Sequence, residues 1–151
     1  MHETAMRFFV PYKTFLLGEY AVLHTGQALL LATRPGFCYE VSLVSHEGDW
    51  MQAWLLLQKQ LGLSEDCPVT TLWRQLCQVK AVRARVLTRP HKGFGSSGAL
   101  AWLALICAYS VRQGQYPDKT EAFFLASMRE YDDLVRVQQG YSPSGGDMIC
   151  Q

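Results

Sequence analysis

The stretch HKGFGSSGALAWLALICAY (residues 91–109) places three glycines and two serines directly before a long apolar run. The preceding segment, AVRARVL (residues 81–87), alternates in polarity and puts Arg83 and Arg85 on one face, which is typical of a half-buried strand. This order predicts a strand, a glycine-rich loop and then a helix over residues 97–112. Because that helix is apolar on nearly all sides, we expect it to be buried in the centre of the fold.

The loop has two interpretations. The first N–H groups of a helix have no intrahelical partner and carry the positive end of its dipole, and glycines let the backbone close on a phosphate. Equally, the serines can simply cap the helix. Gly93, Gly95 and Gly98 match GxGxxG, but no acidic residue follows in a βαβ unit, and the Walker A pattern is missing. On the loop alone, a phosphate site and a capped turn are equally supported.

The remaining segments predict an α+β fold, because strands gather early in the chain and helices late. A turn at Thr25 and Gly26 is followed by a strand-like run that we expect to be buried. Further strands are predicted over residues 6–10, 14–17, 38–44 and 81–87, and another begins at residues 148–150. Further helices are predicted over residues 50–61, 69–79 and 118–138, the last capped by Thr120 or Asp118.

Composition, charge and cysteine content exclude several classes of function for this protein. The 151 residues suffice for one domain, and a net charge of +1 without a basic cluster gives no case for nucleic acid binding. The start of the chain does not have the pattern of a signal peptide, and the longest apolar run is too short to span a bilayer. Five cysteines without a CxxC pair predict buried free thiols rather than disulfides. We therefore expect a cytoplasmic protein that binds neither membrane nor nucleic acid.

Two more segments, together with the loop, resemble the GHMP kinase family of galactokinases, homoserine kinases, mevalonate kinases and phosphomevalonate kinases. PYKTFLLGEYAVL (residues 11–23) is similar to the first motif of that family, HKGFGSSGA to the second, and SPSGGDMICQ (residues 142–151) to the stretch that carries the catalytic aspartate. The form GEYAVL is closest to the mevalonate and phosphomevalonate kinases. The resemblance implies that residues 1–151 form the N-terminal GHMP kinase domain, of the ribosomal protein S5 domain 2-like class.

The resemblance also implies a cofactor site and a reaction. ATP would lie with its phosphates over the loop, together with Mg²⁺, and its γ-phosphoryl group would pass to a hydroxyl or phosphate of mevalonate, phosphomevalonate or a similar metabolite of isoprenoid biosynthesis. Ser97 corresponds to a Mg²⁺ ligand, and Glu19 to a glutamate near the metal, although a surface or turn glutamate is equally supported. The residues that correspond to phosphate contacts are Gly93, Gly95, Ser96, Ser97 and Gly98.

The implied catalytic pair is Asp147 and Lys13. Asp147 corresponds to the aspartate that takes the proton of the acceptor hydroxyl, and Lys13 to the lysine that pairs with it. A nearby cation keeps such a carboxylate ionised and lowers the pKa of the hydroxyl. Phosphoryl transfer needs mainly positioning and neutralisation of charge, which this set would supply.

Two of the departures from the family pattern bear directly on function. Arg136 stands where mevalonate kinases carry a Mg²⁺-binding glutamate, and Asp132 and Asp133, one turn earlier, either replace it or form a solvated helix face. Family members continue into a ferredoxin-like second half, whereas this chain stops at Gln151, so we expect a fragment, half of a split gene or a degenerate protein. The expected partners are a second copy or that missing half. The alternative function is a non-catalytic nucleotide-binding remnant or an interaction module on the same fold.

Overall fold

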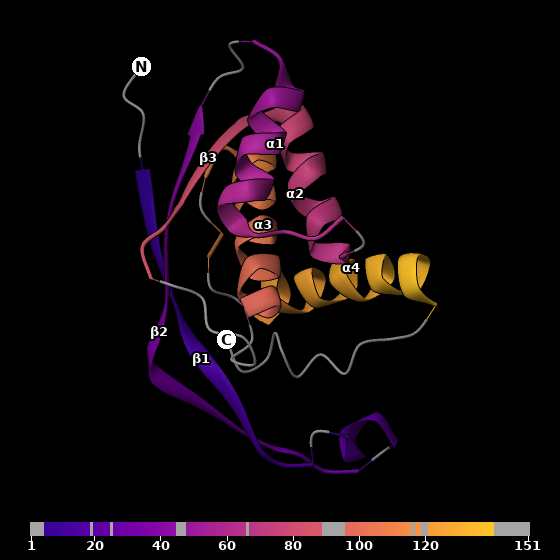
Figure 1. Cartoon of the computed structure of the whole chain (residues 1–151). Coiled ribbons are helices and arrows are strands. Elements are labelled where there is room, and N and C mark those ends of the chain that lie inside the picture. The colour runs from indigo at the N-terminus through magenta and orange to yellow at the C-terminus, as the bar shows by residue number, and fades with distance from the viewer. Residues whose placement is uncertain are drawn as a thin grey trace.

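The computed structural model describes residues 5–18, 20–24, 26–44, 48–65, 67–88, 96–115, 117–118 and 121–140. An antiparallel sheet in the order β1-β2-β3 forms one layer, and the helices cover one face of it (Figure 1). This arrangement confirms the predicted α+β class. The elements are β1 (Ala5–Leu17), the 3-10 helix η1 (Ala21–His24), β2 (Leu29–Val44), α1 (Trp50–Leu61), α2 (Pro68–Val79), β3 (Ala81–Val86), α3 (Ser96–Gln113) and α4 (Glu121–Gln139).

The strand β1 joins two segments that the sequence separates. Residues 6–10 and 14–17 form one strand, so the prediction that Pro11 bounds the first is wrong. Pro11 lies on an edge strand of the described sheet, where a missing N–H need not interrupt the ladder. The register with β2 shifts between Pro11 and Tyr12, and this irregularity lets the strand continue past the proline.

Gly36 of β2 lies opposite Pro11 of β1. A Cβ at Gly36 would collide with the carbonyl oxygen of Val10 and would lie 2.8 Å from the ring of Phe9. The close pairing of β1 with β2 at this point therefore requires a residue without a side chain.

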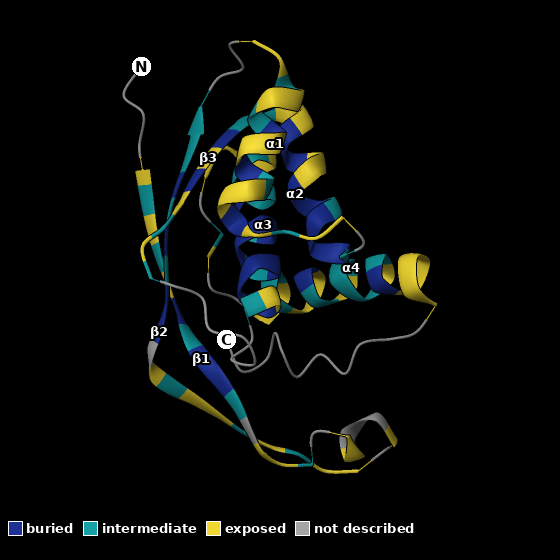
Figure 2. Ribbon diagram, viewed as in Figure 1, coloured by how far each residue is buried: buried dark blue, intermediate teal, exposed yellow. Residues whose placement is uncertain are grey.

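The β1–β2 ribbon extends well beyond the helices (Figures 1 and 2). β3 pairs only with the later part of β2, from Tyr39 to Val44, so the described part of the sheet adds no third strand to the rest of β2. Leu29 and Leu31 are accordingly 53% and 47% exposed. The strand after the Thr25–Gly26 turn is thus confirmed, but the expectation that it is buried is wrong.

The helices follow local signals closely. Met51 donates its backbone N–H to the Asp49 side chain at the start of α1, and Gly62 ends the helix in the left-handed conformation at φ 66°. Pro68 opens α2, as its fixed φ favours. α4 begins at Glu121, so Asp118 is not its cap, and Thr120 lies outside the described residues. The strand expected at residues 148–150 also lies outside them.

The core lies between the sheet and α1, α2 and α3. Trp73 of α2 is completely buried and donates its indole N–H to the carbonyl oxygen of Leu100 in α3 at 3.1 Å. α3 buries small residues along most of its length, which confirms its predicted central place; they include Gly98, Ala99, Ala101, Ala104 and Cys107. Over the described part of the chain, every helix is too short or too polar to cross a bilayer.

The thiols of Cys38, Cys67, Cys77 and Cys107 are free, as predicted. Only Cys77 and Cys107 are buried, and Cys150 lies outside the described residues. Burial raises the pKa of the Cys77 thiol to about 11 and that of Cys107 to about 12. Burial, with a smaller contribution from Tyr12, also raises the pKa of Tyr39 above its usual range.

These buried acids predict a loss of stability at alkaline pH. The ordinary thiol pKa is 9.0, so above about pH 9 the unfolded chain releases protons that the folded chain retains. We expect the free energy of unfolding, measured with urea, to fall steadily between about pH 9 and pH 11. In the variant with Cys77→Ala and Cys107→Ala the fall becomes shallower, with Tyr39 still contributing. A constant free energy across this range would contradict the assignment.

Gly36→Ala tests the close approach of β1 and β2 at this position. We expect it to lower the free energy of unfolding by about 1–3 kcal/mol, because the new methyl group forces the strands apart. Gly114→Ala is the matched control, since its Cβ meets nothing within 4 Å and only its φ of 69° is unfavourable. The control should cost about 1 kcal/mol. If both variants lose the same free energy of unfolding in urea, the strands do not approach closely at Gly36.

Candidate functional site

The start of α3 is the described part of the predicted phosphate loop. Gly93 and Gly95 lie outside the described residues, whereas Ser96 opens the helix and is half-buried. Ser97 is exposed and Gly98 is buried. The first N–H groups of an 18-residue helix therefore lie beside an exposed hydroxyl, which is an arrangement suited to an anion.

Lys13 lies in the interior of the protein, beside an irregularity in the pairing of β1 with β2. Regular alternation would bury only one of two neighbouring residues, but Tyr12 and Lys13 are both buried directly after the register shift. Lys13 is only 6% exposed and takes part in an interaction. Lysine is rarely this buried unless it is paired, so the position carries a structural or functional requirement for a cation. β1 is also one of the strands that α3 packs against.

The other predicted site residues are not brought together by the described structure. Asp147 and Glu19 lie outside the described residues. Asp132 accepts a hydrogen bond from Arg136 Nε at 2.7 Å, one helical turn away, and Asp133 is exposed. Within the described ranges, no three His, Cys, Asp or Glu residues are grouped so that they could hold a metal ion.

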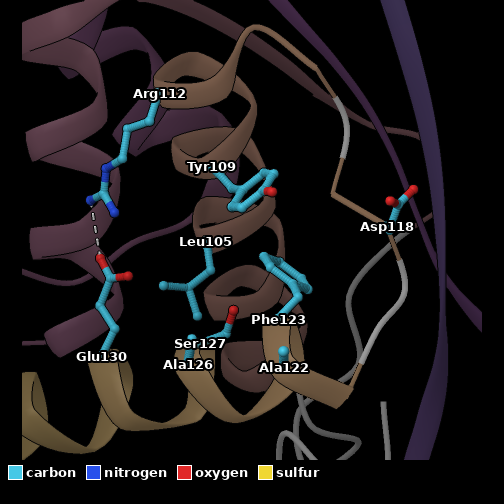
Figure 3. Close-up of a pocket in the computed structure, with 9 residues that line it drawn as sticks. All are labelled: Leu105, Tyr109, Arg112, Asp118, Ala122, Phe123, Ala126, Ser127 and Glu130. Carbon is cyan, nitrogen blue, oxygen red and sulfur yellow. Dashed lines mark hydrogen bonds and ion pairs between the residues drawn. The ribbon is translucent and has the colours of Figure 1, made fainter.

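A cavity of about 380 Å³ lies between α3 and α4 and was not anticipated from the sequence (Figure 3). Two aromatic rings, Tyr109 and Phe123, form part of its wall and meet edge to face at 5.2 Å between centroids. Arg112 at the end of α3 donates to Glu130 of α4 at 3.2 Å. The described residues that line it are Leu105, Tyr109, Arg112, Asp118, Ala122, Phe123, Ala126, Ser127 and Glu130.

Ser127 is the unusual member of this lining. It is 4% exposed, and its hydroxyl points toward Leu105 and the cavity (Figure 3). Among the described residues it has no hydrogen-bond partner. Ser110 on α3 makes the usual local bond, to the Ile106 carbonyl oxygen at 2.9 Å. A polar residue four positions after Phe123, on the same helix face, was the only sign of this site in the sequence.

The cavity is separate from Ser97 and Gly98, although both involve α3. Tyr109 comes twelve positions after Ser97, which corresponds to about 18 Å along the helix axis. The described residues of the predicted phosphate site therefore lie at the start of α3, and the cavity lies toward its end.

Three comparisons of this chain with known proteins were made, and none of them finds a match. Neither a family model, nor a curated protein, nor a solved structure matches this chain.

Proposed function

We propose that this chain is the N-terminal domain of a cytoplasmic small-molecule kinase of the GHMP type. It would transfer the γ-phosphoryl group of ATP to a hydroxyl or phosphate of mevalonate, phosphomevalonate or a similar metabolite. The observation that carries the proposal is the burial of Lys13 on β1, against which α3 packs. A kinase of this type needs a fixed cation near the reacting oxygen, and a buried lysine meets that need.

The residues at the start of α3 fit the phosphate groups of ATP. Orphan helix N–H groups and the exposed Ser97 hydroxyl are suitable donors to an anion. In this proposal Lys13 keeps Asp147 ionised, and Asp147 accepts the proton of the acceptor hydroxyl. Bound Mg-ATP supplies the phosphoryl group. Ser97 is the only proposed Mg²⁺ ligand within the described ranges, and they contain no acidic cluster, so no step is assigned to the metal.

A second candidate function is a non-catalytic nucleotide-binding or interaction module on the same fold. The Arg136–Asp132 ion pair favours it. Arg136 brings a positive charge to the position where mevalonate kinases carry a metal-binding glutamate, and its pairing partly neutralises the aspartate that could have replaced that glutamate.

The exposed end of the β1–β2 ribbon supports a partner for this domain. An isolated two-stranded ribbon is marginally stable in water, and its apolar side chains favour association. We propose self-association or association with a C-terminal half as the role of this surface. Its exposed apolar residues are Leu16, Leu17, Tyr20, Leu29 and Leu31.

Mg-ATP tests the two candidate functions. We expect Mg-ATP at 100 times its Kd to stabilise the chain by about 2.7 kcal/mol, measured as a rise in melting temperature. Transfer to mevalonate or phosphomevalonate should be abolished by Asp147→Ala and unaffected by the control Glu65→Gln, which changes an exposed carboxylate with no proposed role. Tight binding without transfer to any acceptor would support the non-catalytic module. The absence of both binding and transfer would contradict both candidates.

Light scattering coupled to size exclusion tests the proposed association. We expect a dimer that becomes monomeric with Leu17→Ser and Leu29→Ser, because both changes remove exposed apolar surface from the ribbon. Leu125→Ser on α4 is the matched control, since this exposed leucine lies on another element. A monomer at high protein concentration would exclude self-association.

A further inference from the structure

The geometry points to a second ligand site in the α3–α4 cavity, which takes a small organic cation with a flat apolar body. The cation faces the carboxylate of Asp118, the flat body lies against Tyr109 and Phe123, and a polar group of the ligand meets the Ser127 hydroxyl. This inference does not depend on the proposed kinase function, because the cavity lies toward the opposite end of α3 from the glycine loop.

The first argument is the buried hydroxyl of Ser127. A hydroxyl removed from water without a hydrogen bond destabilises the fold, and such groups in native proteins call for an explanation. Ser127 is more than nine-tenths buried, is directed into the cavity (Figure 3) and has no hydrogen-bond partner among the described residues. A bound molecule with a donor or acceptor at this point would satisfy it.

The second argument is the shape and chemistry of the walls. Apolar and aromatic surfaces with a few converging polar groups are the usual lining of small-molecule sites, and about 380 Å³ falls within their size range. Leu105, Ala122 and Ala126 supply apolar surface beside the Tyr109 and Phe123 rings (Figure 3). Aromatic rings also attract a cation through their faces, so they favour this charge on a ligand.

The third argument is the balance of charge around the cavity. Arg112 and Glu130 pair with each other at 3.2 Å, so this guanidinium is already engaged by a carboxylate. Asp118 is exposed at another part of the lining, apart from that pair (Figure 3), and makes no ion pair within the described ranges. Among the described residues that line the cavity, two carboxylates stand against one guanidinium, so their formal charges sum to a net negative value. A cation is therefore favoured over an anion of the same shape.

The probe is 2-(4-hydroxyphenyl)ethylammonium, whose phenol hydroxyl supplies the polar group for Ser127, titrated into the full chain and followed by amide chemical shifts in NMR. 3-(4-Hydroxyphenyl)propionate and 2-(4-hydroxyphenyl)ethanol serve as the anionic and neutral analogues. We expect the cation to bind at least about fivefold more tightly than the anion. The largest shifts should fall on Tyr109, Phe123 and Ser127.

Two variants with matched controls locate the contacts. Asp118→Asn should weaken binding of the cation about threefold, whereas Asp133→Asn on the outer surface of α4 should leave it unchanged. Ser127→Ala should weaken binding about threefold to tenfold and also raise the melting temperature of the free protein, because it removes an unsatisfied buried hydroxyl. Ser110→Ala is its control, since that hydroxyl is already bonded to Ile106, and it should not raise the melting temperature.

Ser127→Ala should raise the melting temperature but weaken binding of the cation. The two effects together distinguish a ligand site from a serine with only a structural role. A raised melting temperature with unchanged affinity for the cation would mean that only water meets this hydroxyl, and it would overturn the proposal. Equal affinity for the cation and the anion would overturn it, as would shifts confined to other parts of the chain. No binding of 2-(4-hydroxyphenyl)ethylammonium at millimolar concentration would overturn it as well.

Discussion

The fold depends on the burial of α3. This helix is apolar around nearly its whole circumference, so it is stable in water only if several elements cover it. β1 and β2 of the sheet, α2 and α4 all pack against it. Small residues such as Ala101 and Ala104 let its neighbours approach closely, and the Trp73 indole, bonded to the Leu100 carbonyl oxygen, fixes α2 against it. The order of the other elements follows from this requirement.

A largely covered helix leaves mainly its ends accessible to other molecules. At its start are helix N–H groups without intrahelical partners and the exposed Ser97 hydroxyl. Toward its end, Tyr109 and Arg112 face α4 across a cavity, because α4 packs against only part of α3. The two ends thus differ in chemistry, with hydrogen-bond donors at one and carboxylates beside aromatic rings at the other.

Much of this architecture could be predicted from the sequence, and the failures share one cause. The helix at residues 50–61 was predicted with its exact bounds, because its apolar residues recur at helical spacing and Gly62 is a local signal for its end. The strand interrupted at Pro11 and the buried leucines after Gly26 were predicted wrongly. A proline permitted on an edge strand and a leucine exposed on a ribbon both depend on which strands lie alongside, and local sequence patterns do not contain that information.

The features of the candidate sites also fall into two groups, those set by local sequence and those set by tertiary packing. Sequence patterns alone were sufficient to assign the α+β class, the bounds of most helices and the serines at the start of α3, because capping and periodicity act between residues close in the chain. The burial of Lys13, beside the register shift between β1 and β2, could not be seen in local sequence patterns. The cavity around Ser127 required α3 and α4 to pack at a particular place. Side chains far apart in sequence meet only through tertiary packing, so these features were decided by the three-dimensional structure.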